Sequence, residues 1–194
     1  ATPASQTADR SSAQRPQHPA QRRFIDRRVD PNPGAGKLDL DLREVDVEQT
    51  AQATVKMLAG IAETAGVALQ VKFAPDFPRL KTDERRLKQI LINIVTNSIK
   101  FTPKGGRVTV EGKRADDGAV ILVLSDTGIG IATKDLPKVM QPFGQVKEAQ
   151  TPGKEGSGLG LPLTKKLVEA LGGTFSLNSV LGAGTSVLIS FPPE

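Results

Sequence analysis

The first half of the chain shows two spacings of apolar residues, the two-residue alternation of a strand and the wider spacing of a helix. Strict alternation at 38–42 predicts a half-buried strand. Helical spacing follows over 45–65, and Gly66 is a good residue to end that helix. The elements predicted for this half are, in order, strand 38–42, helix 45–65, strand 67–73, a short extended piece at 79–81 and helix 83–101, with Thr82 or Asp83 as N-cap.

The second half is richer in strands. Residues 119–126 are apolar on both faces, which predicts a central strand. The remaining predicted elements are strand 107–113, a turn at 116–118, a short helix at 134–140, helix 158–171 and strands 174–178 and 185–191. Consecutive strands without an intervening helix have hairpin-like spacing, so we predict an α+β fold, a two-layer sandwich of a mixed sheet with helices on one face.

Composition excludes several classes of function. The chain has 194 residues, no Cys and a single His, which rules out disulfides and Cys- or His-rich metal sites. No apolar run approaches the ~18 residues of a membrane span. The absence of Trp and Tyr argues against base-stacking nucleic-acid platforms.

The net charge of +5 comes from one end of the chain. Residues 1–37 hold seven Arg and Lys against three Asp, while 38–194 hold 19 basic against 18 acidic groups. Residues 1–37 also lack an apolar pattern, which predicts a disordered basic linker or tail. We therefore divide the chain into this tail and a folded domain at 38–194, and interpret the Arg pairs as solvated charge or as a contact for an acidic partner.

Three glycines alternate with small or apolar residues in Gly156-Ser157-Gly158-Leu159-Gly160-Leu161, directly before a helix. Glycine lets backbone N–H groups approach a ligand, and a helix N-terminus attracts anions, so this stretch predicts a phosphate site. The preceding residues 142–157 carry Pro and Gly with few apolar anchors, as mobile lids do.

Two further sets of polar residues carry candidate chemistry. Asn93, Asn97, Lys100 and Phe101 form one stripe of helix 83–101, which is either a solvated face or a ligand set for Mg²⁺ and phosphate. Asp126 ends the most hydrophobic strand and precedes Thr-Gly-Ile-Gly. Its carboxylate either accepts a hydrogen bond from an exocyclic amine in an apolar pocket or caps the following turn.

Five stretches, in order and spacing, resemble the signature boxes of sensor histidine kinases. They are the N box at 93–101, a first glycine box at 126–130, an F box at 142–145, a second glycine box at 156–161 and a third at 182–185. The resemblance covers about residues 38–192. It implies the Bergerat ATP-binding fold, with about five strands against about three helices.

The resemblance also implies roles for these residues, with ATP and Mg²⁺ as cofactors. Asn97 would bind Mg²⁺, Asn93 and Lys100 would act at the metal and the phosphates, and Asp126 would read the adenine amine. The residues implied to bind ATP are Asn93, Asn97, Lys100, Phe101, Asp126, Gly128, Gly130, Ile131, Phe143, Gly156, Ser157, Gly158, Leu159, Gly160, Leu161 and Thr185. Gln145 stands near where relatives often carry Arg or Lys, and Lys147 and Lys154 in the implied lid are candidates for closing on phosphate charge.

The predicted function is the ATP-binding catalytic domain of a two-component sensor histidine kinase. It would transfer the γ-phosphoryl group to a His on a separate dimerisation domain and act upstream of a response regulator. His18 lies in the tail without the acidic neighbour of an acceptor, so this chain supplies no acceptor. The alternatives are a nucleotide-binding pseudokinase and an anti-sigma-type serine kinase of the same fold. We expect no nucleic-acid partner, no membrane contact and a cytoplasmic location, free or as part of a membrane-bound sensor.

Overall fold

The computed structural model describes residues 39–146 and 157–193, and predictions for residues 1–38 and 147–156 lie outside the described residues. The chain-order elements are β1 (Arg43–Val45), α1 (Val47–Ala65), β2 (Ala68–Phe73), β3 (Leu80–Thr82), α2 (Glu84–Phe101), β4 (Arg107–Arg114), β5 (Val120–Asp126), the 3₁₀ helix η1 (Thr133–Asp135), α3 (Leu136–Val139), α4 (Gly160–Ala170), β6 (Thr174–Val180) and β7 (Gly184–Phe191).

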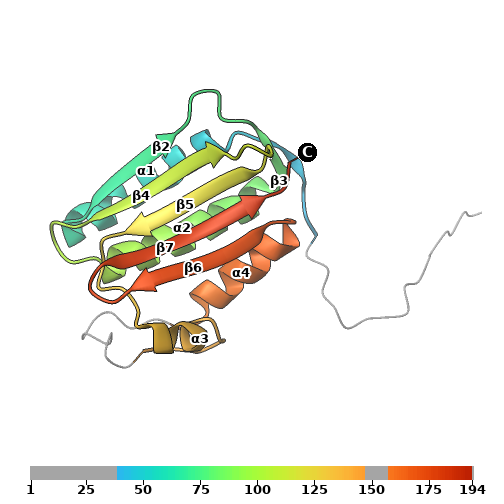
Figure 1. The fold of residues 1–194 in the computed structure, drawn as a ribbon. Helices are drawn as coiled ribbons and strands as arrows, with labels where there is room; N and C mark the ends of the chain where they lie inside the picture. Colours follow the sequence, from blue (N-terminus) through green and yellow to red (C-terminus); the bar gives the residue numbers. More distant parts are fainter. Residues whose placement is uncertain (1–38, 147–156, 194) are drawn as a thin grey trace, which may run out of the picture. The chain divides into compact units, whose positions relative to one another are not determined.

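Five strands form one mixed sheet in the order β2-β4-β5-β7-β6. β2 runs parallel to β4, and the other neighbours are antiparallel. Helices α1, α2 and α4 lie against one face of this sheet, which confirms the predicted two-layer α+β fold (Figure 1). β5 is the central strand, as its apolar sequence predicted.

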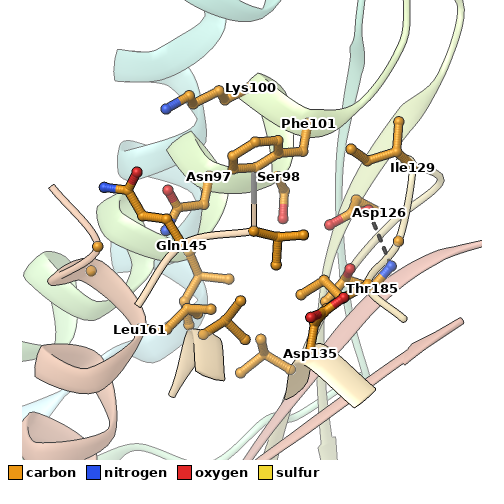
Figure 2. Close-up of a pocket in the computed structure, with 18 of the residues that line it drawn as sticks. Asn97, Ser98, Lys100, Phe101, Asp126, Ile129, Asp135, Gln145, Leu161 and Thr185 are labelled. Carbon is orange, nitrogen blue, oxygen red and sulfur yellow. Dashed lines mark hydrogen bonds between the residues drawn. The ribbon is translucent and has the colours of Figure 1, made fainter. Parts of the chain in front are cut away.

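Helix α2 lies between α1 and α4 in the helical layer. Its apolar residues share one side, which is buried against the sheet. The buried ones are Leu87, Ile90, Leu91, Ile94, Val95 and Ile99. They pack in the same core as the inward residues of the central strands, Val108, Val110, Leu122, Leu124, Val187 and Ile189. The polar stripe predicted on the same helix is thereby turned toward the end of the sheet where β5 finishes (Figure 2).

The predicted strand at 38–42 is wrong in position. β1 starts at Arg43 and pairs only with β3, forming a two-stranded sheet that the sequence did not predict. The alternation of Leu and Asp is not used for pairing, and Leu42 is 50% exposed. Asp41 instead donates its backbone N–H to Asp83 Oδ2 at 3.0 Å, and its carboxylate pairs with Arg43.

Asp83 joins this entering segment to the start of α2. Asp83 is 1% exposed, and its side chain accepts the Arg86 N–H as the N-cap of the helix. Burial alone would raise the pKa of this carboxyl, but the backbone N–H groups of Asp41, Arg86 and Arg85 and the charge of Arg85 lower the pKa below its ordinary value. The ionised carboxylate is therefore the form that the fold stabilises.

Helix boundaries differ from the predictions by small steps. α1 begins at Val47 because the Asp46 side chain caps it by accepting the Gln49 N–H at 2.9 Å, and Gly66 ends it at φ +68°. α4 begins at Gly160 rather than 158, since Gly158 has φ +67°, outside the helical range. The short helix at 134–140 is divided into η1 and α3.

Candidate functional site

A cavity of about 520 Å³ lies where the C-terminal half of α2, the end of β5 and the start of α4 meet. Figure 2 shows Asn97, Gln145 and Leu161 on one side of it and Asp126 and Thr185 on the other. This volume is within the ~300–1,000 Å³ of small-molecule sites.

Most of the predicted site residues converge on this cavity. Those that line it are Asn93, Asn97, Lys100, Phe101, Asp126, Gly130, Ile131, Ser157, Gly158, Gly160, Leu161 and Thr185. Three others, Gly128, Phe143 and Leu159, are not among the lining residues. Gly156, Lys147 and Lys154 lie outside the described residues, as does most of the predicted lid.

Asp126 occupies the end of the central strand, opposite Thr185 on β7. Its Oδ1 accepts the N–H of Gly128 at 2.9 Å and the N–H of Thr185 at 3.1 Å. The carboxylate thus caps the following turn and also lines the cavity, so the two interpretations of its sequence context are compatible. Within the described part of the chain, no hydrogen bond to Oδ2 is formed.

The glycines around Asp126 are required by backbone packing. A Cβ on Gly130, which has φ +67°, would lie 2.0 Å from the Val180 carbonyl oxygen, and one on Gly128 would lie 2.6 Å from Asp126 Oδ1. Gly182 donates its N–H to the Ile129 carbonyl at 2.7 Å. The loop after β5 is therefore held against the β6–β7 hairpin, and this contact shapes one wall of the cavity.

The asparagines of α2 face the start of α4. Asn93 Nδ2 donates to the Gly160 carbonyl at 2.6 Å and to Thr164 Oγ1 at 2.5 Å. A Cβ on Gly160 would lie 3.1 Å from Asn97 Nδ2, so this glycine allows the close approach. Both asparagines are half-buried and line the cavity, but the structure uses the Asn93 amide as a contact between the two helices.

Lys100 and Phe101 complete the stripe on the last turn of α2. The Lys100 Nζ lies 5.1 Å from the centroid of the Phe101 ring, in range of a cation–π contact. Both residues line the cavity, and Figure 2 shows the Phe101 ring above it. The cavity therefore has a cation close to its apolar part.

Phe143 does not enter the cavity, contrary to expectation. Phe143 is 73% exposed and has a φ of +63°, and its backbone N–H donates to the Gly158 carbonyl at 3.0 Å. A Cβ on Gly158 would lie 2.8 Å from Phe143 Cα. The backbone of the F box, rather than its ring, thus closes this side of the cavity. Leu159 is likewise turned outward, with 39% exposure.

Several contributors were not predicted. The additional apolar lining residues include Ile129, Ala132, Val139, Leu181 and Val187, and Asp135 adds a carboxylate from η1. Ser179, on β6, bonds to three groups around the loop after β5. These residues come from separate elements, so only the pairing of β6 with β7 and the packing of the hairpin on the loop bring them here.

The donor set limits which metal the site could hold. Across residues 39–146 and 157–193, no group of three or more His, Cys, Asp or Glu could hold a metal ion. A cation here could be held by oxygens that line the cavity, such as the Asn97 amide or the Asp135 carboxylate, together with oxygens of a ligand and water. Mg²⁺ is bound in this way beside nucleotide phosphates.

None of the helices in the described ranges is long and apolar enough to cross a membrane.

Comparison with known proteins gives relatives over most of the chain. The Non-motile and phage-resistance protein of Caulobacter vibrioides is 40% identical over 161 residues, covering 81% of this chain and 19% of that protein. Histidine protein kinase DivJ of the same organism is 37% identical over 158 residues, covering 81% and 26%. The chain thus spans about a fifth to a quarter of the length of these relatives.

Solved structures agree with the fold. Full-length ShkA in complex with AMPPNP is 29% identical with a TM-score of 0.72, covering 81% of this chain and 32% of that one. The mycobacterial sensor histidine kinase MprB, at 24% identity, has a TM-score of 0.65 and shares the fold over 79% of this chain.

The family model described as "Histidine kinase-, DNA gyrase B-, and HSP90-like ATPase" matches residues 82–194. These residues include α2, β5, α4 and β7, which together supply the walls of the cavity. The match covers more than half of the 194 residues, and the chain therefore belongs to this ATPase family.

Proposed function

We propose that this chain is the ATP-binding catalytic domain of a two-component sensor histidine kinase. The observation that carries the proposal is the cavity itself, which gathers Asp126, Asn97 and the glycine stretch before α4 from distant parts of the sequence. Family membership and the named histidine kinase relatives support it. Phosphoryl transfer needs positioning and charge neutralisation more than covalent help, and such a cavity suits that task.

Each wall has a proposed role. Asp126 Oδ2 accepts a hydrogen bond from the amine of adenine, and Phe101 and Ile131 contact the base. Backbone N–H groups of residues 157–161 and the Lys100 ammonium face the phosphates, because the N-terminus of α4 favours negative charge. These roles place the base at the end of β5 and the phosphates beside α4.

The Asn97 amide oxygen fits a role as a Mg²⁺ ligand. The side chain is half-buried, lines the cavity and forms no hydrogen bond within residues 39–146 and 157–193. When bound, Mg²⁺ neutralises phosphate charge during transfer. Asn93 is already bonded to Gly160 and Thr164, so we assign it to holding α4 beside Asn97.

The proposed partners supply the phosphoacceptor histidine and the final receiver of the phosphoryl group. The acceptor is a histidine on a dimerisation domain, and the phosphoryl group passes from there to a response regulator. The sequence has a single His, His18, which is followed by Pro19 rather than by the acidic neighbour of an acceptor, and this supports an acceptor supplied from elsewhere.

Transfer of label from ATP tests this function. The chain is mixed with Mg²⁺, γ-labelled ATP and a separate histidine-containing dimerisation domain from a related kinase. Acid-labile label on that histidine is the expected result. At ATP concentrations below the Kd of the variant, Asp126→Asn should strongly reduce the label, while Asp116→Asn, at an exposed turn, should not. Nucleotide binding without transfer to any histidine would instead favour the pseudokinase alternative, and label on a serine would favour the serine kinase.

A further inference from the structure

Thr164 lies in the second turn of α4 and is fully buried, with 0% exposure, and the proposed function gives its hydroxyl no role. It is not among the residues that line the cavity. Its hydroxyl donates to the Gly160 carbonyl at 2.9 Å and accepts from Asn93 Nδ2 at 2.5 Å. Asn93 Nδ2 also donates to the Gly160 carbonyl, at 2.6 Å. These three groups therefore form a closed set of hydrogen bonds between α2 and α4.

The orientation of the Asn93 amide is fixed by the protons that these groups carry. A backbone carbonyl can only accept, so the end of the amide that faces Gly160 is the NH₂ group. Thr164 donates its single proton to Gly160 as well, and its lone pair therefore receives the second amide proton of Asn93. Both protons of the Asn93 amide are thus used between the two helices.

The Asn93 oxygen remains for the cavity. A Cβ on Gly160 would lie 3.0 Å from Asn93 Oδ1 and 3.1 Å from Asn97 Nδ2, and all three residues line the cavity. Within residues 39–146 and 157–193, no hydrogen bond to Asn93 Oδ1 is formed. Asn93 therefore offers the ligand an acceptor and no donor, which suits a cation or its bound water and does not suit a phosphate oxygen.

We propose that Thr164 is a positioning residue for the cation site, because it takes the second amide proton of Asn93 and so holds the Asn93 oxygen toward the cavity. The inference rests on the proposed function, since it takes the ligand to be a nucleoside triphosphate with Mg²⁺. Without the Thr164 hydroxyl, one N–H of Asn93 loses its acceptor and can turn to donate to a phosphate oxygen. Thr164 thus acts through Asn93 and touches neither the cation nor the nucleotide.

Removing this hydroxyl alone should preserve the fold. Valine has the same branching at Cβ as threonine, and Asn93 keeps its bond to the Gly160 carbonyl. Thr54 on α1 is a matched control, because it is also 0% exposed and donates to the carbonyl one turn earlier, that of Thr50, at 2.8 Å. Thr54→Val therefore removes the same kind of bond from a helix that does not line the cavity.

The test measures the affinity of the 194-residue chain for ATP by isothermal titration, once with excess Mg²⁺ and once with EDTA. Wild type is expected to bind ATP more tightly with Mg²⁺. Thr164→Val should lower the ratio of the two affinities roughly three- to tenfold, the value of about one hydrogen bond. Thr164→Ser keeps a hydroxyl and should keep the wild-type ratio, and Thr54→Val should keep it too.

Side-chain amide NMR supplies a readout that a merely structural role would not move. Both NH₂ protons of Asn93 should resonate as bonded amide protons in wild type. One of them should move toward the position of a free amide in Thr164→Val and return in Thr164→Ser. If Thr164→Val fails to fold, the wild-type spectrum decides, because an Asn93 proton at the position of a free amide overturns the inference.

The outcomes separate this inference from the proposed function. Wild type that binds no ATP overturns both. Wild type that binds ATP equally well in Mg²⁺ and EDTA overturns the inference and leaves ATP binding in place. A folded Thr164→Val variant with an unchanged ratio, or with the same loss of affinity in Mg²⁺ and EDTA, overturns the role of Thr164 alone.

Discussion

Replacing Asp126 by Asn changes one side of the cavity with little effect on the backbone. The Asn carbonyl can keep both bonds that Oδ1 accepts, from Gly128 at 2.9 Å and Thr185 at 3.1 Å. The amide NH₂ then stands where Oδ2 was, and a donor faces the donor of the adenine amine. The substitution therefore alters recognition of the base while preserving the turn.

The magnitude follows from the bond that is lost. A hydrogen bond to a charged group contributes about 1.5–3 kcal/mol, so the Kd for ATP should rise about 10- to 150-fold. At an ATP concentration 100 times the wild-type Kd, the ligand stabilises wild type by about 2.7 kcal/mol. The same concentration should stabilise Asp126→Asn by only about 0.3–1.3 kcal/mol.

Isothermal titration and thermal melts with and without Mg²⁺–ATP measure both quantities. Without nucleotide, the Tm of Asp126→Asn should lie within about 4 °C of wild type, since a loss near 1 kcal/mol shifts a domain of this size by that amount. Asp116→Asn, at the exposed β4–β5 turn, is the matched control and should bind ATP as wild type does. Unchanged ATP affinity in a folded Asp126→Asn variant would refute the assignment of this carboxylate to the base.

Three further substitutions test other parts of the structure. Asn97→Ala should remove most of the Mg²⁺ dependence of ATP binding in titrations. The control Asn178→Ala, at an exposed position on β6, should keep that dependence. Equal Mg²⁺ dependence in the two variants would contradict the metal role of Asn97. Asp83→Asn should lower the free energy of unfolding by about 1 kcal/mol at neutral pH. Because the folded pKa of Asp83 is depressed, that contribution is present above the ordinary Asp value of about 3.9 and is lost as pH falls through the folded pKa, so urea midpoints of the two proteins should converge in acid. In denaturant titrations, Gly130→Ala should lower the free energy of unfolding by more than about 2 kcal/mol, because this residue has a φ of +67° and a Cβ would lie 2.0 Å from a carbonyl oxygen. The control Gly60→Ala, in open space on α1, should raise the free energy of unfolding by up to about 1 kcal/mol.

Local sequence patterns predicted the long elements well. α2 and β5 were predicted because their apolar residues repeat with the period of the element and share the core. The strand at 38–42 failed because alternation shows only that a strand could form. Whether it pairs depends on β3, more than 30 residues away, which offers just three residues. The two-stranded sheet could not be predicted from either segment alone.

The candidate site was predictable where a residue type is tied to a motif, as for Asn97, Asp126 and Gly130. It was not predictable where position depends on packing between distant elements. Phe143 was expected in the cavity, but it has a positive φ and is exposed, and the cavity is not lined by it. The contacts of Ser179 have no local signal, because its hydrogen bonds form only when β6 pairs with β7 and the loop after β5 packs on their hairpin.

The most direct test of the central claim is where an adenine nucleotide binds on this chain. Backbone amide NMR spectra recorded during titration with Mg²⁺–AMPPNP report this residue by residue. We predict saturable shifts at Asn97, Asp126, Gly130, Gly160 and Thr185, with little change at the exposed Lys113 and Ser176 on the sheet. Saturable shifts confined to residues outside the cavity, or no shifts at millimolar nucleotide, would contradict it.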